Sequence, residues 1–311
     1  MTYLEITVKT TAQNIASTAA ALTAGGFSEL VIEDQCEFES FLEENRACWD
    51  YIDEDLQEKL QGLSCIKLYL EDTDKEGLSR LENLVAGLGL EMTVTTLAEE
   101  NWEESWKDNY PPQSVGKTMV VLPYWLADTD TQGRTPIILD PGLTFGTGAH
   151  PSTQMVLETM EETVKPGAAC LDLGSGSGIL SIAALRLGAK SAIGVDIDPK
   201  AEDIARENAA YNGFAAPEFT AYTGNVTQDI ALMDKLSQGH YDVVLVNIVA
   251  DVIIGLAPVL PHFLNENSLL LCSGILDTRL TDVRAALEKA GLNILEVKAK
   301  EDWRSLCAKR R

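Results

Sequence analysis

The sequence predicts an α/β protein with a smaller N-terminal α+β domain and a larger, doubly wound, mostly parallel sheet. Two observations lead to this fold class. From residue 169 onward, near-continuous apolar segments of strand length alternate with longer amphipathic segments, as in sheets that carry helices on both faces. The first hundred residues instead follow the order strand, helix, strand, strand, helix, strand. A length of 311 residues accommodates two such domains.

The first domain is expected to span residues 1–100. Alternating polar and apolar residues predict strands, and glycine-terminated segments predict helices, in the order strand 2–9, helix 11–24, strand 28–33, strand 65–70, helix 75–88 and strand 91–97. This β-α-β-β-α-β order is typical of the ferredoxin-like fold. Because no catalytic cluster occurs in it, we interpret the domain as a substrate-recognition or positioning module, with a purely structural role as the alternative.

Residues 101–116 are expected to be a linker helix, and residues 117–311 the second domain. Trp102 and Trp106 lie four residues apart, on one helix face, before two prolines stop the helix. In the second domain, strands are expected at 117–122, 135–139, 169–173, 191–196, 218–222, 241–246, 268–273, 292–298 and 303–309, and helices at 178–187, 199–212, 249–263 and 278–290.

Charge and composition exclude several classes of function. The formal net charge of −24 has the wrong sign for gripping a phosphate backbone, so we expect no direct nucleic-acid binding. Residues 1–110 carry 24 acidic and 7 basic residues, and such an acidic module favours a basic partner. The six cysteines form no CxxC pair and only three histidines are present, so we expect no metal site. With no leader or membrane span expected either, a cytoplasmic protein is predicted.

The strongest local signal is a glycine-rich loop between a strand and a helix, Cys170-Leu-Asp-Leu-Gly-Ser-Gly-Ser-Gly-Ile-Leu180. Gly174 and Gly176 permit a tight turn and let a ligand approach the backbone. Ile179 stands where the dinucleotide fingerprint needs its last glycine, which disfavours a nicotinamide-dependent dehydrogenase. The spacing GxGxG with Asp172 two residues ahead is instead similar to that of S-adenosylmethionine-dependent methyltransferases.

Polar residues after the next strands extend this interpretation. Asp196 ends the second strand, 22 residues after Gly174, where a carboxylate accepts hydrogen bonds from ribose hydroxyls. Asn225, after the third strand, is a candidate adenine contact or part of an ordinary turn. Asn247 ends the fourth strand, either as a helix cap or as an amide whose carbonyl orients a nucleophilic amine.

A loop rich in glycine and proline, Leu139-Asp-Pro-Gly-Leu-Thr-Phe-Gly-Thr-Gly-Ala-His-Pro-Ser-Thr153, precedes the glycine-rich strand. Its composition excludes a regular element, and we expect a loop over the ligand crevice. It leads into a helix that Ser152 or Thr153 would cap. We interpret His150 as a hydrogen-bonded structural histidine, with a catalytic base as the alternative.

Together these blocks resemble the PrmA family, the methyltransferases of large-subunit ribosomal protein eleven. The matching blocks, in order, are LDPGLTFGTGAHPST, LDLGSGSGILSIAALRLGA, GVDIDPKAEDIARENAAYNG, NIVADVI and LLLCSGIL. The pairing of the FGTGxHP loop with the Asn-Ile block is specific to that family. Departures are mild: Ser152 replaces the usual threonine, Val249 the common leucine, and the acidic stretch 34–62 is longer than in some members.

The resemblance implies a Rossmann-like methyltransferase sheet that binds S-adenosylmethionine and releases S-adenosylhomocysteine. It places cofactor contacts on Thr153, Gly174, Asp196 and Asn247, and a lid over the methionine portion on Phe145, Gly146 and Thr147. The implied substrate is ribosomal protein eleven, held by the N-terminal domain and methylated on lysine ε-amines and its N-terminal α-amine. A monomer is expected. A methyltransferase for another protein or small-molecule amine and a catalytically silent cofactor-binding scaffold are the alternatives.

Overall fold

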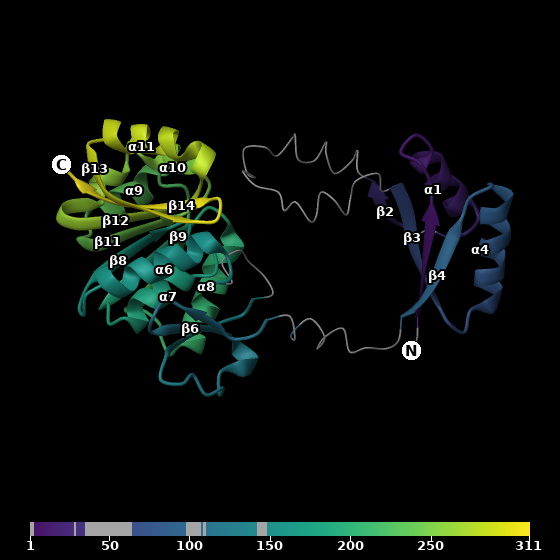
Figure 1. The fold of residues 1–311 in the computed structure, drawn as a ribbon, viewed down its shortest axis with the longest axis horizontal. Helices are drawn as coiled ribbons and strands as arrows, with labels where there is room; N and C mark the ends of the chain where they lie inside the picture. Colours follow the sequence, from purple (N-terminus) through teal and green to yellow (C-terminus); the bar gives the residue numbers. More distant parts are fainter. Residues whose placement is uncertain (1–2, 28, 35–63, 98–106, 108–109, 142–147) are drawn as a thin grey trace. The chain divides into compact units, whose positions relative to one another are not determined.

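The computed structural model describes residues 3–27, 29–34, 64–97, 107, 110–141 and 148–311. The chain divides into two compact units, Met1–Asn109 and Tyr110–Arg311 (Figure 1). The division falls within the predicted linker helix 101–116, of which residues 101–106 and 108–109 lie outside the described residues. Residues Gln113–Val115 of that range form a strand, β5, that belongs to the second unit.

The first unit is a four-stranded antiparallel sheet with two helices. Its elements are β1 (Tyr3–Lys9), α1 (Ile15–Ala24), β2 (Val31–Asp34), β3 (Ser64–Glu71), α4 (Lys75–Gly87) and β4 (Met92–Leu97). The spatial order is β2-β3-β1-β4, with every neighbouring pair antiparallel. Because β3 lies between β1 and β2, this is the split β-α-β arrangement that the sequence predicted.

Alternation along the strands gives this unit a core on one face only. Leu4, Ile6 and Val8 of β1 are buried with Ile66 and Leu68 of β3, in one cluster with residues of both helices. The intervening side chains point to the opposite face of the sheet. Tyr3 and Tyr69 on that face are 41% and 45% exposed, so the open face offers aromatic surface.

The second unit contains a seven-stranded sheet with the order β10-β9-β8-β11-β12-β14-β13. Its strands are β8 (Ala169–Leu173), β9 (Ser191–Asp196), β10 (Phe219–Thr223), β11 (Tyr241–Asn247), β12 (Leu264–Leu276), β13 (Leu292–Lys300) and β14 (Trp303–Arg310). The first five strands in the spatial order are parallel, whereas β14 runs antiparallel to β12 and β13. Strand order reverses between β8 and β11, and such a switch point opens a crevice at the carboxyl ends of the strands.

Helices cover both faces of this sheet (Figure 1). One core cluster contains residues of α6 (Pro151–Thr163), α7 (Ile179–Arg186) and α8 (Pro199–Tyr211). The other contains residues of α9 (Ile230–Ser237), α10 (Ala250–Leu256) and α11 (Leu280–Lys289). Successive residues of β11 enter alternate clusters, Val243 and Leu245 the first, Val244 and Val246 the second. This is why the strand reads as a continuous apolar run.

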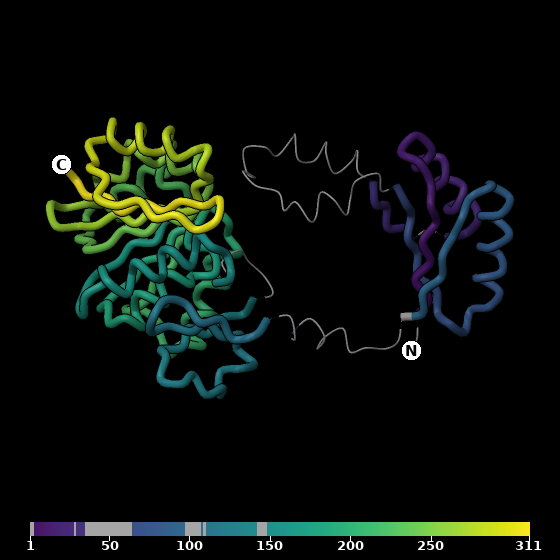
Figure 2. Tube along the Cα trace, viewed as in Figure 1, coloured from purple at the N-terminus to yellow at the C-terminus, as the bar shows by residue number. Residues whose placement is uncertain are grey.

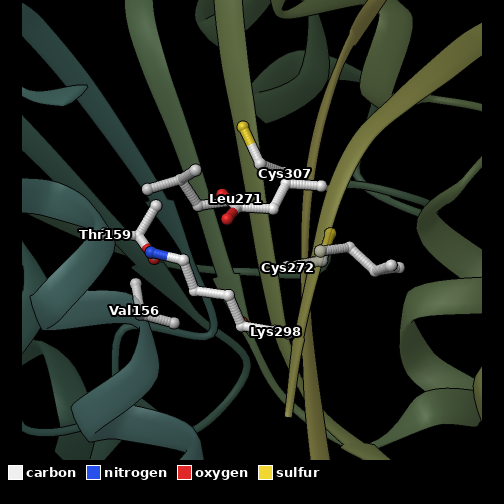
Figure 3. A pocket seen from close by; sticks show the side chains of 9 residues that line it. Val156, Thr159, Leu271, Cys272, Lys298 and Cys307 are labelled. Carbon is white, nitrogen blue, oxygen red and sulfur yellow. The ribbon is translucent and has the colours of Figure 1, made fainter. Parts of the chain in front are cut away.

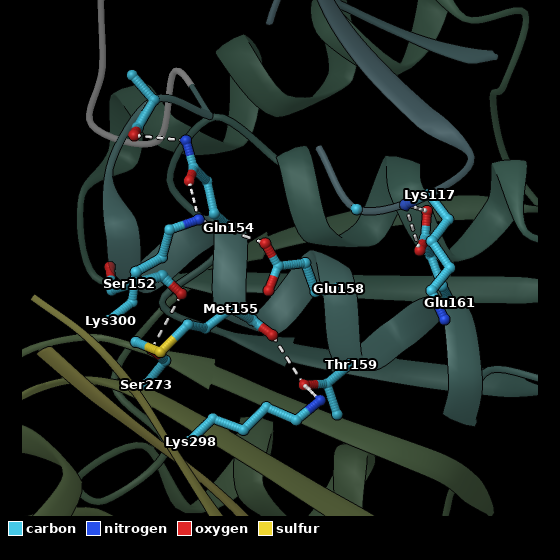
Figure 4. Close-up of polar contacts among 12 residues, drawn as sticks. Lys117, Ser152, Gln154, Met155, Glu158, Thr159, Glu161, Ser273, Lys298 and Lys300 are labelled. Atoms are coloured by element: carbon cyan, nitrogen blue, oxygen red, sulfur yellow. Dashed lines mark hydrogen bonds and ion pairs between the residues drawn. The ribbon is translucent and has the colours of Figure 1, made fainter. Parts of the chain in front are cut away.

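A smaller sheet joins the α6–α8 side. It consists of β5, β6 (Met119–Pro123) and β7 (Thr135–Leu139), with β6 antiparallel to β5 and parallel to β7. The β5–β6 turn is held by Glu161 of α6, whose carboxylate accepts hydrogen bonds from the backbone nitrogens of Lys117 and Thr118 (Figure 4). The small sheet thus delivers the end of β7 to the face occupied by α7 and α8.

Some elements differ from the sequence prediction. The helix expected over 249–263 ends at Leu256 and is followed by a 3-10 turn at Leu260–His262, because Pro258 and Pro261 cannot donate the next helical hydrogen bonds. Helix α9 was not predicted, and the helix expected from residue 278 begins as a 3-10 turn at Asp277–Arg279. The two yellow strands at the end of the trace, β13 and β14, pair with each other along the sheet edge (Figure 2).

No helix among the described residues is long and apolar enough to cross a membrane. The same part of the chain contains no group of three or more metal-binding side chains.

Candidate active site

The glycine-rich loop connects β8 to α7 at the switch point of the sheet. Gly174, Gly176 and Gly178 have φ of +80°, +49° and +79°, a region that favours glycine. The backbone nitrogens of Gly174 and Ser175 both donate to the Val195 carbonyl of β9, at 2.8 and 3.1 Å. The loop therefore forms the tight strand-to-helix turn that the sequence predicted, and it is anchored to the neighbouring strand.

Ile248, the residue after Asn247, lies in close contact with glycines on both sides. A Cβ added to Gly174 would lie 2.4 Å from Ile248 Cγ2, closer than real Cβ contacts. A Cβ added to Gly274, where φ is +82°, would lie 2.4 Å from the Ile248 carbonyl oxygen. The ends of β8, β11 and β12 can therefore approach this closely only because both positions are glycine.

Asp196 lies at the end of β9 with its carboxylate fixed by backbone groups. Its Oδ2 accepts a hydrogen bond from the Gly176 nitrogen at 2.8 Å, and its Oδ1 accepts one from the Asp198 nitrogen at 3.0 Å. A carboxylate has further lone pairs on each oxygen, so these bonds orient it and leave capacity to accept from a ligand. Asp198 caps α8, because its Oδ1 accepts a hydrogen bond from the Lys200 nitrogen.

A buried carboxylate lies beneath the loop. Asp172 is 1% exposed, and its Oδ2 accepts bonds from the nitrogen and hydroxyl of Ser181 at 3.2 and 2.9 Å. Its Oδ1 is buried without a hydrogen-bond partner among the described residues. Burial raises the pKa of Asp172 to about 7, although the Ser181 bonds act in the opposite direction. A buried acceptor of this kind calls for a donor or a positive charge nearby.

Asn247 and Thr153 meet across the crevice. Asn247 ends β11, Thr153 lies in the first turn of α6, and Asn247 Nδ2 donates to Thr153 Oγ1 at 3.1 Å. The adjacent Ser273 hydroxyl of β12 donates to the Ser152 carbonyl at 2.9 Å (Figure 4). The start of α6 is therefore tied to the ends of β11 and β12. Because the amide nitrogen of Asn247 bonds Thr153, its oxygen occupies the other end of the carboxamide.

His150 acts as the helix cap, which corrects the expectation that Ser152 or Thr153 caps α6. Its Nδ1 accepts from the Ser152 nitrogen at 3.3 Å and lies 2.7 Å from the Ser152 hydroxyl. The ring also packs edge-on against Trp303 of β14, with centroids 4.5 Å apart. Burial lowers the pKa of His150, so the neutral ring that caps the helix is favoured. These contacts agree with the structural interpretation of this histidine.

The remaining predicted residues are placed less directly. Asn225 follows β10, and its Oδ1 accepts bonds from the nitrogen and hydroxyl of Thr227 at 2.9 and 2.7 Å, so this oxygen holds a local turn. The lid residues Phe145, Gly146 and Thr147 lie outside the described residues.

Two buried asparagines near the site escaped the sequence analysis. Asn208 lies on α8 and Asn212 is the residue directly after its end; they are 0% and 6% exposed and share a side with Ala201, Ala205 and Ala209. The sequence does contain a signal for them: two polar residues stand within a stripe of alanines on the side of the helix that faces the sheet. The sequence predicts a helix at 199–212, without a role for its asparagines.

A shallow pocket elsewhere in the unit is unrelated to these residues. It lies between α6 and strands β12–β14, and its lining includes Val156, Thr159, Cys272, Lys298 and Cys307 (Figure 3). Burial raises the pKa of the Cys272 thiol, which disfavours the reactive thiolate. Lys298 donates to the Thr159 hydroxyl at 3.0 Å, and Lys300 bonds Gln154 and Glu158 (Figure 4). These contacts join the edge strand β13 to α6.

The arrangement fits a nucleoside ligand with a positively charged end. Asp196 offers a carboxylate for the ribose hydroxyls, and the glycine loop allows close backbone approach. Beneath the loop, Asp172 Oδ1 has no hydrogen-bond partner among the described residues, and a nearby positive charge would favour the ionised form of this carboxyl. Fold and site together define a Rossmann-like S-adenosylmethionine-dependent methyltransferase. The chain belongs to the PrmA family: the family model described as "Ribosomal protein L11 methyltransferase (PrmA)" matches residues 2–311.

Individual relatives agree with this assignment. The ribosomal protein L11 methyltransferase of Alkaliphilus oremlandii is 35% identical over 319 residues, covering 99% of each chain. That of Caldanaerobacter subterraneus is 37% identical over 321 residues, covering 100% of each chain. Among solved structures, the ribosomal protein L11 methylase of Lactobacillus delbrueckii is 31% identical with a TM-score of 0.57, covering 65% of this chain and all of that one.

Proposed function

We propose that this enzyme transfers methyl groups from S-adenosylmethionine to lysine ε-amines and the N-terminal α-amine of ribosomal protein L11, the eleventh protein of the large subunit. The observation that carries the proposal is that the family match extends over residues 2–311 and so includes both units. The domain assignment is part of it: residues 1–100 recognise the substrate, 101–116 link, and 117–311 catalyse.

The chemistry requires positioning more than acid–base catalysis. S-adenosylmethionine supplies an electrophilic methyl group on a sulfonium. Asp196 would hold the ribose, Thr153, Gly174 and Gly176 would line the bound ligand, and the loop segment with Phe145, Gly146 and Thr147 would cover its methionine portion. Asn225 would contact the adenine from the end of β10. In this arrangement the amine nitrogen would be held in line with the methyl group, which converts a bimolecular reaction into a unimolecular step.

Asn247 is the proposed catalytic residue. Its Nδ2 is held by Thr153, so the amide oxygen has a fixed direction from which to accept an N–H bond of the incoming amine. A lysine amine, with a pKa near ~10.4 in water, must lose a proton before its lone pair can attack. A carbonyl-lined slot that excludes water favours the neutral amine because burial disfavours the charged form. The amine nitrogen would form its bond to the methyl carbon while the carbon–sulfur bond breaks and its electron pair stays on sulfur, so that the sulfonium leaves as a neutral thioether. The methylated ammonium would then lose its extra proton to water.

The acidic first unit is the proposed grip on the substrate. Its open sheet face carries the exposed Tyr3, Val31 and Tyr69, and Tyr69 donates to Glu5 on the same face at 3.1 Å. Residues 1–110 hold 24 acidic and 7 basic residues, and complementary charge speeds encounter with a basic protein. We propose that the enzyme acts as a monomer, in the cytoplasm, without binding nucleic acid directly.

Labelled S-adenosylmethionine tests the substrate. The purified chain is incubated with separated ribosomal proteins, and an Asn247→Ala enzyme gives the background. We expect label in L11, and mass spectrometry of its peptides should place the methyl groups on lysine side chains and the N-terminus. Label in another protein or in a small-molecule amine, with L11 unmodified, would establish the alternative instead.

Ionic strength tests the role of the charge. The rate of L11 capture should fall as salt screens the acidic unit, with a smaller effect on methyl transfer once L11 is bound. A capture rate that does not change with salt would contradict this part of the proposal.

A further inference from the structure

Asn208 is an uncharged polar residue in the middle of helix α8 and is completely buried. Burying an amide costs free energy unless its donor and acceptor are both used. Both are used here: Nδ2 donates to the Ser177 carbonyl at 2.8 Å, and Oδ1 accepts from the Asp140 nitrogen at 2.8 Å. One side chain thus joins two backbone segments that are far apart in the sequence.

The two segments both belong to the cofactor side of the sheet. Ser177 lies in the glycine-rich loop, directly after Gly176, whose nitrogen donates to Asp196 Oδ2. Asp140 is the first residue after β7. Asn208 therefore fixes the separation between the loop that orients the Asp196 carboxylate and the segment that leaves β7.

Asn212, one helical turn later, sets the register of this contact. Its Oδ1 accepts from the Ile138 nitrogen at 3.0 Å, and its Nδ2 donates to the Ile138 carbonyl at 2.7 Å. Four residues of helix advance about 6 Å, and two residues of strand advance about 6.6 Å. The spacing between Asn208 and Asn212 therefore matches the spacing between Asp140 and Ile138, the two backbone positions that they bind. Arg186 of α7 also donates to Asn212 Oδ1, at 3.3 Å.

Close packing makes this contact stiff. A Cβ added to Gly178 would lie 3.0 Å from the Cβ of Ala205, so the glycine-rich loop rests directly on α8 three residues before Asn208. A displaced Ser177 carbonyl would lose its hydrogen bond from the buried Asn208 amide, and the loop has little free space to adjust.

We propose that Asn208 is a positioning residue for the cofactor site, because its carboxamide holds the glycine-rich loop and the residue after β7 at the spacing that cofactor binding requires. This inference rests on the methyl-transfer function proposed above. It differs from a general stabilising role because the affected quantity is cofactor affinity, beyond any loss of folding stability.

The test compares Asn208→Ala with Val283→Ala, a buried change in α11 within the other core cluster. Affinity for S-adenosylhomocysteine is measured by calorimetry, and stability by denaturant unfolding. We expect N208A to weaken binding of S-adenosylhomocysteine about tenfold or more, whereas V283A, at a comparable loss of folding stability, should weaken it less than about twofold. The Asp140 amide hydrogen should exchange about tenfold faster in N208A than in V283A. Equal effects of the two variants on binding would overturn the proposal.

Asn208→Asp provides a second arm that remains informative if N208A does not fold. A protonated aspartic acid can donate to Ser177 and accept from Asp140 as asparagine does, whereas the carboxylate cannot donate. Affinity is measured for N208D and the wild type at each pH, and the ratio of the two is taken. The titration of Asp140, Asp172, Arg186 and Tyr211 then cancels because both proteins contain these groups. This ratio should fall as pH rises. A ratio that stays constant between pH 5 and about 9 would contradict the proposal. If L11 is not methylated by the wild type, the proposed substrate fails while these binding measurements keep their meaning.

Discussion

Asn247 at the end of β11 donates a hydrogen bond of 3.1 Å to the hydroxyl of Thr153 in the first turn of α6. The two residues lie 94 positions apart in the chain, and the bond selects one orientation of the Asn247 carboxamide. The geometry of the proposed amine-binding oxygen thus depends on a side chain from a different element.

Asn247→Ala should lower methyl transfer far more than cofactor affinity. We expect kcat to fall about 100-fold, as is seen when one oriented polar group is removed from an active site. The Kd for S-adenosylhomocysteine should change by less than about threefold. Single-turnover kinetics and calorimetry measure the two quantities. Asn265→Ala, at the opposite end of the same strand pair, is the control. Equal losses in rate and affinity would show that Asn247 is only a binding residue.

Thr153→Val removes the acceptor of the Asn247 amide while keeping the shape of the side chain. The carboxamide is then free to turn, so kcat should fall about tenfold while the fold is retained. Thr153→Ser keeps the hydroxyl and should restore most of the rate. If T153V and T153S are both as active as the wild type, the bond does not orient the catalytic amide.

Gly174→Ala should abolish tight cofactor binding because its Cβ would meet Ile248 at 2.4 Å. Gly133→Ala is a matched control, since Gly133 has φ of +82° and nothing within 4 Å of its Cβ position. Both variants carry the backbone penalty of about 1–2 kcal/mol, but only G174A adds the clash. The thermal shift on adding S-adenosylhomocysteine should disappear in G174A and persist in G133A. Loss of the shift in both would assign the effect to the backbone alone.

Asp172 makes stability depend on pH. Burial raises its pKa from 3.8 to about 7, so its contribution is fully present below about pH 4 and is lost as pH rises through about 7. Asp172→Asn lacks this ionisation. The free energy of unfolding of D172N relative to the wild type should therefore increase with pH across that window, by at most about 1.4 kcal/mol per pH unit. Denaturant unfolding measures it, with Asp203→Asn on exposed α8 surface as control. Parallel pH profiles of D172N and the wild type would refute the prediction.

Periodicity predicted the elements that local sequence determines. The strand ranges 169–173 and 191–196 coincide with β8 and β9, because each is an apolar run bounded by clear turn residues. The glycine loop and the position of Asp196 followed from the same reasoning. In contrast, α9 was not predicted: it has eight residues, as α7 does, but no glycine-rich loop marks its start.

Partners distant in the chain could not be predicted. Nothing near Asn247 in the sequence indicates Thr153 as its partner, and nothing near Asn208 indicates Ser177 and Asp140. The hydrogen bonds of His150 agree with its structural interpretation, but its capping role depends on a backbone turn that composition does not specify. Side-chain hydrogen bonds between elements depend on how the elements pack, and local sequence patterns do not reveal that packing.

The contacts of Ile248 determine which substitutions are tolerated at the two neighbouring glycines. Gly174 meets the Ile248 side chain, so a shorter residue at 248 removes the clash with alanine at 174, although the backbone strain of φ +80° remains. Gly274 meets the Ile248 carbonyl, which every amino acid retains, so no change at 248 can make room for a side chain there. A shorter residue at 248 should therefore rescue alanine at 174 in part, down to the backbone penalty, whereas no residue at 248 should rescue alanine at 274.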